Sequence, residues 1–153
     1  MLVRNVMTPR AETIGPGETV QAAAIRMREL GVGALVVREG EELLGILTDR
    51  DIVVRCIALG GSPAVAEVRS AMTPQIIDCH ASDDLHGAVT RMVKGAVRRA
   101  VVLDEEERLV GVLSVDDVAL RSPAMAGEIL EHVRDPERPV PTAPFSWWEE
   151  PAH

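Results

Sequence analysis

An internal repeat constrains this sequence more than any other feature. The Met-Thr-Pro triplet at residues 7–9 recurs at residues 72–74, a spacing of 65. Later blocks recur at a spacing of 66, and we expect the added residue between Gly95 and Ala100, where a turn would absorb it. The block 26–27 recurs at 91–92 with the spacing of 65, and the blocks with the spacing of 66 are 34–37 with 100–103, 45–48 with 111–114, and 51–52 with 117–118. Because order and spacing persist over successive blocks, the chain contains a duplication.

Each copy has the apolar spacing of a strand, a helix, two strands and a second helix. We expect short strands at 12–14 and 76–78, each followed by a helix whose apolar residues recur every three or four positions. These helix faces comprise Val20, Ala23, Ala24 and Met27 in the first copy and Leu85, Ala88, Val89 and Met92 in the second. Hairpins of buried strands are expected at 34–37 with 43–47 and at 100–103 with 109–113.

Capping residues indicate where the first helix of each copy begins and ends. Thr19 suits the N-cap in the first copy, and either Ser82 or Asp84 suits it in the second. Gly31 and Gly95 suit the C-terminal stops, because glycine adopts the left-handed conformation readily.

The predicted domain organisation follows the repeat. Repeat 1 spans 1–62, and repeat 2 spans 63–122 and begins with a linking helix at 63–71. The C-terminal region, 123–153, holds a helix and then a Pro-rich tail. The candidate apolar contacts of that helix are Met125, Ile129 and Leu130. A unit of about 60 residues buries too little surface to be stable alone, so two units must pack together in an α/β (α+β) fold.

Composition narrows the classes of function. The three aromatic residues, Phe145, Trp147 and Trp148, lie in the last nine positions, so residues 1–142 offer no ring for stacking nucleic-acid bases. The net charge of −8 also disfavours binding to a phosphate backbone. No apolar run approaches the ~20 residues that span a bilayer, and two cysteines are too few for a disulfide scaffold. We therefore expect a cytoplasmic protein that binds neither nucleic acid nor membrane.

The most informative motif follows the last strand of each copy. Thr48 and Asp51 in the first copy, and Ser114 and Asp117 in the second, fit the pattern Gly-x-x-Thr/Ser-x-x-Asp. This spacing is typical of a capping box, in which the hydroxyl caps a helix and the carboxylate reaches back. A hydroxyl and a carboxylate at such a junction can also bind a sugar diol, and the presence of two equivalent copies favours this ligand site.

Together, the duplicated unit, the Met-Thr-Pro triplet and this motif resemble a pair of CBS domains, the module named after cystathionine beta-synthase. The resemblance covers residues 3–121 and implies two β-α-β-β-α repeats packed sheet to sheet about a pseudo-twofold axis, with two clefts between them. It implies a regulatory module that catalyses no reaction and requires no cofactor. The implied ligand contains adenosine: AMP, ADP, ATP, S-adenosylmethionine or NAD. The implied assembly is a homodimer.

The resemblance also assigns candidate ligand-binding residues. Asp117 and Asp51 match the ribose-binding carboxylate of the family, and Ser114 and Thr48 match the hydroxyl beside it. One cleft is then expected to join Asp117 with Thr8, Val32, Gly33 and Ala34, and the other to join Asp51 with Thr73, Arg98, Arg99 and Ala100. The arginines match positions that meet phosphates, and the first copy has a glycine where the second has an arginine, so the clefts are expected to differ. Without aromatic rings, adenine is expected between aliphatic side chains, with Val32, Ile14, Ile46 and Val112 as candidates.

Two alternative functions remain open on the residues alone. In the first, the clefts are filled by side chains such as Arg99, and the protein binds a partner through its dimer surface or through Phe145, Trp147 and Trp148. In the second, Cys79 and His80 form a metal- or thiol-dependent active site. The second is disfavoured because no cysteine pair has metal-ligand spacing, and we interpret Cys79 and Cys56 as small core residues.

Overall fold

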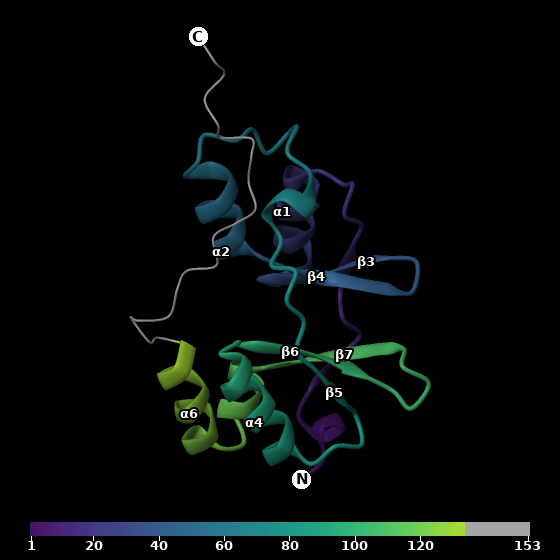
Figure 1. Ribbon diagram of the computed structural model, residues 1–153, viewed down its shortest axis with the longest axis vertical. Helices are drawn as coiled ribbons and strands as arrows, with labels where there is room; N and C mark the ends of the chain where they lie inside the picture. The colour runs from purple at the N-terminus through teal and green to yellow at the C-terminus, as the bar shows by residue number, and fades with distance from the viewer. Residues whose placement is uncertain (134–153) are drawn as a thin grey trace. The chain divides into compact units, whose positions relative to one another are not determined.

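The structure, a computed structural model, describes residues 1–133 and has the mixed α/β fold predicted from the sequence (Figure 1). Two compact units form within it. Of the described residues, unit 1 contains Met1–Ala11 and residues 76–133, and unit 2 contains Glu12–Gln75. The N-terminal segment, which precedes the first copy in sequence, therefore folds with the second copy. The aromatic tail, with Phe145, Trp147 and Trp148, lies outside the described residues.

Unit 2 is built on a three-stranded sheet. Its strands are β2 (Thr13–Ile14), β3 (Ala34–Glu39) and β4 (Glu42–Thr48), in that spatial order. Strand β2 pairs parallel with β3, and β3 pairs antiparallel with β4. The helical segments of unit 2 are α1 (Val20–Leu30), α2 (Asp49–Ile52), the π-helical η2 (Val53–Ile57) and α3 (Val68–Ala71).

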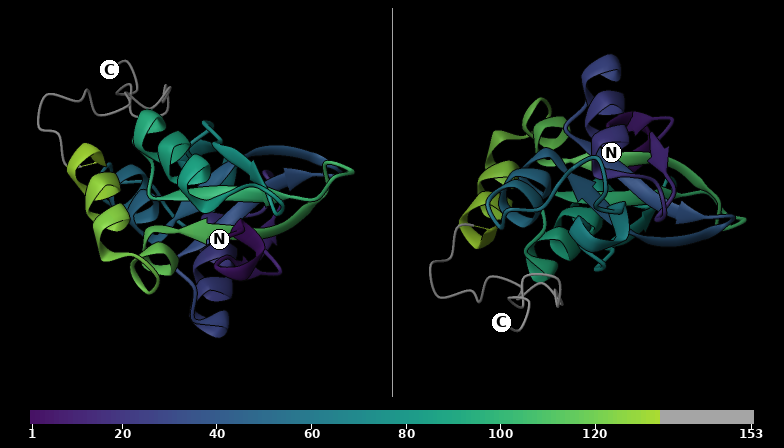
Figure 2. Two further views of the ribbon diagram at one scale, coloured as in Figure 1. Left: turned by 90° about the horizontal axis from the view of Figure 1, so that it is seen from below. Right: turned by 90° about the horizontal axis from the view of Figure 1, so that it is seen from above.

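Unit 1 repeats this arrangement and extends it by one strand and one helix. Its sheet has the order β1 (Thr8–Pro9), β7 (Leu109–Ser114), β6 (Arg99–Leu103), β5 (Asp78–His80). Its helices are the 3-10 helix η1 (Val3–Asn5), α4 (Leu85–Gly95), α5 (Val115–Ala119) and α6 (Pro123–Val133). Helix α6 contacts both α4 and α5, and Figures 1 and 2 show α4 and α6 side by side.

Each unit has its own aliphatic core. All four predicted residues of α4 are buried, and so are Val20, Ala23 and Met27 of α1. The prediction for Ala24 is wrong, because this side chain is exposed on the outer face of α1. Val3 is fully buried in the core of unit 1. Cys56 and Cys79 are free thiols in the cores of units 2 and 1, which confirms their interpretation as core residues.

The capping predictions hold at three of the four helix ends. Thr19 and Asp84 accept hydrogen bonds from backbone N–H groups in the first turn of their helices, and Gly31 ends α1 in the left-handed conformation. The prediction for Gly95 is wrong, because Ala96 takes the left-handed position with a φ of 47°. A Cβ at position 95 would lie 2.8 Å from the Ile77 side chain, so this glycine permits close packing instead.

Strand register shows that the extra residue of the second copy lies elsewhere than predicted. Val37 pairs with Gly45, and Val102 pairs with Gly111, so the spacing between the copies is still 65 at β3 and β6. It becomes 66 only across the hairpin that follows. The prediction of an insertion between Gly95 and Ala100 is therefore wrong, because the hairpin turn contains the extra residue.

The linking helix predicted at 63–71 is shorter than expected. Only α3, its last turn, is helical. Thr19 forms an antiparallel bridge with Glu67, whose backbone is extended at φ −82° and ψ 150°. Because an extended residue cannot continue a helix, α3 begins one residue later.

Candidate functional site

A hydroxyl–carboxylate cluster forms where β7 runs into α5. Ser114 is the N-cap of α5, and its Oγ accepts a hydrogen bond of 3.1 Å from the Asp117 N–H. The Asp117 Oδ2 atom accepts bonds from the Ser114 N–H at 2.8 Å and from the Ser114 hydroxyl at 2.7 Å. This reciprocal pairing is a capping box, which fixes the carboxylate at the strand–helix junction.

The Met-Thr-Pro triplet brings a third group to this cluster. Strand β1 pairs antiparallel with β7, and Thr8 lies opposite Val112. The Thr8 hydroxyl donates a 3.1 Å hydrogen bond to Oδ1 of Asp117 across 109 positions of sequence. The structure thus brings together Thr8, Ser114 and Asp117, which we call the Asp117 cluster.

Unit 2 contains the equivalent set, which we call the Asp51 cluster. The Thr48 N–H donates to Asp51 Oδ2 at 2.9 Å, and the Asp51 N–H donates to Thr48 Oγ1 at 3.0 Å. Thr73 forms an antiparallel bridge with Ile46, with N–H to carbonyl distances of 2.8 and 2.9 Å. Burial raises the pKa of Asp51, and a hydrogen bond from the Thr73 hydroxyl to this carboxylate opposes the rise.

A fourth residue, Arg55, joins the Asp51 cluster and was not identified in the sequence. Its Nε lies 3.9 Å from Asp51 Oδ1, and its Nη1 donates to the Met72 carbonyl at 3.0 Å. Burial raises the pKa of Asp51, while the Thr48 N–H, the Arg55 charge and the two threonine hydroxyls oppose that rise. The only sequence signal for Arg55 is its place four residues after Asp51, one helical turn away.

The glycine of each motif has a role that the sequence pattern did not reveal. A Cβ at Gly111 would lie 2.6 Å from the Thr8 carbonyl oxygen, and one at Gly45 would lie closer still to that of Thr73. Each glycine therefore lets the threonine-bearing segment approach the strand closely enough to place its hydroxyl beside the carboxylate.

The remaining predicted site residues lie at the start of β3 and β6. Val32 and Gly33 precede β3, Ala34 pairs with Thr48, Arg98 precedes β6 and Arg99 pairs with Ser114. The contacts expected between Asp117 and residues 32–34, and between Asp51 and residues 98–100, would involve residues of different units. They stay predictions. Two of the four aliphatic candidates for the base pocket are buried, Ile14 at 2% and Ile46 at 9% exposed, so they have little surface to offer a base.

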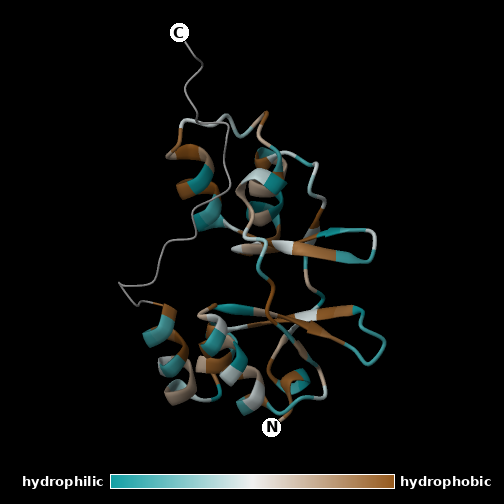
Figure 3. Cartoon of the chain, viewed as in Figure 1, coloured by the Kyte–Doolittle hydropathy of each residue, from teal (hydrophilic) through white to brown (hydrophobic). Residues whose placement is uncertain are grey.

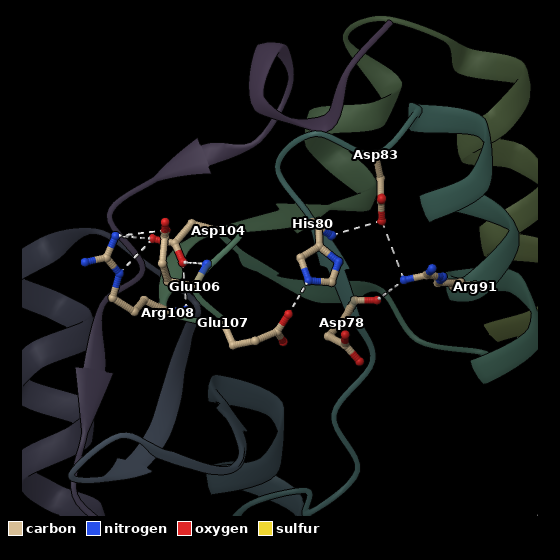
Figure 4. Close-up of polar contacts among 8 residues, drawn as sticks. All are labelled: Asp78, His80, Asp83, Arg91, Asp104, Glu106, Glu107 and Arg108. Atoms are coloured by element: carbon tan, nitrogen blue, oxygen red, sulfur yellow. Dashed lines mark hydrogen bonds and ion pairs between the residues drawn. The ribbon is translucent and has the colours of Figure 1, made fainter.

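Cys79 and His80 lie in different surroundings, the thiol in the core of unit 1 and the imidazole beside Glu107. Within residues 1–133, no group of three or more His, Cys, Asp or Glu side chains is arranged to hold a metal ion. Burial raises the pKa of the Cys79 thiol to about 11, which keeps it protonated and unreactive near neutral pH. His80 instead lies 2.7 Å from Glu107 Oε1 and ties β5 to the β6–β7 turn (Figure 4).

Comparison with known proteins assigns the family. A family model for the CBS domain matches the chain twice, over residues 3–57 and 65–123. The chain therefore belongs to the CBS domain family and contains a tandem pair of these domains. Among residues 1–133, no helix combines the length and the apolar character needed to cross a membrane.

Similar sequences occur in bacteria and archaea. The CBS domain-containing protein YhcV of Bacillus subtilis is 34% identical over 135 residues, covering 86% of this chain and 94% of YhcV. The uncharacterized protein MK0525 of Methanopyrus kandleri is 31% identical over 123 residues. That match covers 80% of this chain but only 63% of MK0525.

Solved structures of CBS proteins share the fold. The conserved CBS domain protein TA0289 of Thermoplasma acidophilum matches with a TM-score of 0.78 and 26% identity, covering 88% of this chain and 77% of that one. The protein CBSX2, solved in complex with AMP, matches with a TM-score of 0.64 and 25% identity. This second match covers 78% of this chain and 93% of CBSX2.

Proposed function

We propose that this protein is a regulatory module that binds an adenosine-containing ligand at its hydroxyl–carboxylate clusters. The observation that carries the proposal is the contact between Thr8 and Asp117. Residues 109 positions apart are held 3.1 Å from each other, and a glycine in β7 leaves room for the approach. Capping α5 needs only Ser114 and Asp117, so the added threonine is not explained by the cap.

The chemistry of the cluster suits the vicinal diol of a ribose. A carboxylate has about four lone-pair sites and, when ionised, accepts hydrogen bonds only. Three of these sites on Asp117 receive bonds from Ser114 and Thr8, which leaves one oxygen able to accept a further hydroxyl. Hydrogen bonds to a charged acceptor are also stronger than those between neutral groups.

The nucleobase and phosphate contacts follow from the residues near the clusters. Val112 lies opposite Thr8 and is partly exposed, and Val32 is partly exposed in unit 2, so both can offer aliphatic surface to an adenine. For a ligand bound at the Asp51 cluster, we assign phosphate contacts to Arg98 and Arg99, because the family resemblance expects these arginines with Asp51. The similar protein CBSX2 was solved with AMP, which supports an adenine nucleotide as the ligand class.

We further propose that the module acts by changing conformation or partner affinity, without catalysing a reaction. A ligand can shift such an equilibrium only if it binds one state more tightly than the other. ADP, ATP, NAD and S-adenosylmethionine share the adenosine group with AMP and remain candidate ligands.

We also propose that the protein self-associates as a homodimer. Within the described residues, three apolar side chains of η2 are exposed: Val53 at 58%, Val54 at 44% and Ile57 at 51%. Figure 3 shows this end of the segment labelled α2 in Figure 1 as hydrophobic. Sedimentation equilibrium tests the proposal: a dimer that Val53→Lys separates supports it, whereas a monomer at micromolar concentration contradicts it.

Thermal unfolding in the presence of candidate ligands tests the binding function. AMP, ADP, ATP, NAD and S-adenosylmethionine are added in turn to the wild-type protein and to Asp117→Asn. Asp116→Asn is the matched control, because Asp116 is an exposed carboxylate in the same first turn of α5 and is not part of the capping box. We expect at least one ligand to raise the midpoint of the wild type and of the control but not that of Asp117→Asn. No increase with any of the five would overturn the proposal.

A further inference from the structure

The two hydroxyl–carboxylate clusters differ in one charged residue, and this difference bears on how many ligands the chain binds. In the Asp51 cluster, the Arg55 guanidinium forms an ion pair with the carboxylate at 3.9 Å. The two side chains are only 12% and 14% exposed. In the Asp117 cluster, no ion pair joins the carboxylate to any residue between 1 and 133.

Arg55 is held in place from two sides. Besides its pairing with Asp51, its Nη1 donates a 3.0 Å hydrogen bond to the Met72 carbonyl, just before Thr73. A ligand that took the Asp51 carboxylate would leave this guanidinium largely buried without its counter-charge. Such an unpaired buried charge is strongly unfavourable, so the pair resists displacement.

The second copy has an arginine at the equivalent position but does not use it in this way. Arg121 lies 66 residues after Arg55, the same spacing that relates Asp117 to Asp51. In the first copy, η2 continues the helix past α2 and places Arg55 one turn beyond Asp51. In the second copy, α5 ends at Ala119, and Arg121 is exposed in the turn that leads to α6.

The exposure of the two threonines also favours ligand binding at the Asp117 cluster. Thr8 is exposed beside Asp117, whereas its counterpart Thr73 is half-buried beside Asp51. A ribose hydroxyl must reach the remaining acceptor site of the carboxylate from solvent, and of the two clusters the Asp117 cluster has the exposed threonine and no competing cation.

We propose that Arg55 is an internal counter-ion that occupies the Asp51 carboxylate, so that each chain binds one adenosine ligand, at the Asp117 cluster. This inference rests on the proposed function and specifies the site. It assigns Arg55 a specificity-determining role: it closes the Asp51 cluster to ligands.

Isothermal titration calorimetry with AMP tests the inference through its stoichiometry. We expect one AMP per chain for the wild type, and binding weakened roughly tenfold by Thr8→Val, which removes a hydrogen bond to a charged acceptor. Arg55→Met removes the counter-ion and should raise the stoichiometry to two. Adding Asp51→Asn to that variant should return it to one. Arg121→Met, which alters the equivalent exposed arginine, is the control and should bind one.

The possible failures can be told apart. Two AMP per chain in the wild type, or one in folded Arg55→Met, would overturn the role of Arg55 while leaving the proposed function intact. If circular dichroism shows that Arg55→Met is unfolded, Arg55→Gln replaces it, because the amide can still donate to the Met72 carbonyl. If AMP gives no heat, the titration is repeated with ADP, ATP, NAD and S-adenosylmethionine. Absence of heat with all five, for both the wild type and Arg55→Met, would overturn the proposed function itself, and the inference with it.

Discussion

At the scale of single residues, local chemistry was predictable from the spacing of residues, whereas the long-range contact of Thr8 with Asp117 was expected only from the family resemblance. The capping role of Ser114 and Thr48 follows from a hydroxyl and a carboxylate three residues apart, which the sequence displays directly. The role of Arg55 could not be predicted, because it depends on a π-helical turn and on a carbonyl supplied by Met72. The role of Gly111 depends on a segment more than a hundred residues away.

The close approach at Gly111 predicts a measurable loss of stability. Gly111→Ala places a methyl group against the Thr8 carbonyl and should lower the free energy of unfolding by about 1–3 kcal/mol. Gly127→Ala is the control, since a Cβ there meets nothing within 4 Å and lies in the interior of α6. It should stabilise the protein by up to about 1 kcal/mol. Urea denaturation measures both, and equal midpoints would contradict the packing argument.

The contact between His80 and Glu107 predicts a pH effect. The hydrogen bond and charge of Glu107 raise the pKa of His80, so the folded state favours the protonated imidazole. This contribution to stability is fully present below the ordinary histidine pKa of about 6.5 and is lost as the pH rises through the raised value. NMR titration of His80 should show a lower pKa in Glu107→Gln. Glu105→Gln, which alters an exposed neighbour in the same turn, should leave it unchanged, and a shift of the same size there would argue against a specific contact.

At the scale of elements, the apolar periodicity was sufficient to predict the helices. Features that depend on pairing between distant strands could not be predicted. The apolar spacing of α1 and α4 predicted both helices and most of their buried faces. The start of α3 could not be predicted, because Glu67 is held extended by a bridge to Thr19. The position of the extra residue also required the observed strand register, since Val37 and Val102 occupy equivalent places only once their partners are known.

Helix α6 is predicted to stabilise unit 1 through a single fully buried side chain. Ile129 is 0% exposed within the core of that unit. Ile129→Ala should therefore lower the free energy of unfolding by about 2–5 kcal/mol. Glu128→Ala changes the exposed neighbouring position and should have an effect within about 0.5 kcal/mol. Similar losses for the two variants would indicate that α6 does not pack as described.

At the scale of the whole molecule, the duplication predicted two similar halves but not the exchange of their N-terminal segments. The triplet at 7–9 precedes the first copy, yet β1 pairs with β7 of the second. The triplet at 72–74 likewise leads into the second copy, while Thr73 pairs with Ile46 of the first. Sequence order alone does not reveal this exchange, because it is set by long-range pairing; the family resemblance did imply it, by expecting Thr8 with Asp117 and Thr73 with Asp51.

Deletion of residues 2–10 tests this exchange. It removes fully buried Val3 and strand β1, both of which belong to unit 1. Amide hydrogen exchange should show that β6 and β7 lose protection while β3 and β4 keep most of theirs. Preferential loss in β3 and β4, the strands that follow the deleted segment in sequence, would contradict the assignment of the segment to unit 1.

The most direct test of the central claim is a crystal structure of the protein grown with AMP. The account predicts one nucleotide per chain, with its ribose hydroxyls on the carboxylate of Asp117 beside Thr8, and with Arg55 still paired to Asp51. A nucleotide whose ribose lies on Asp51, or one bound away from both carboxylates, would contradict it.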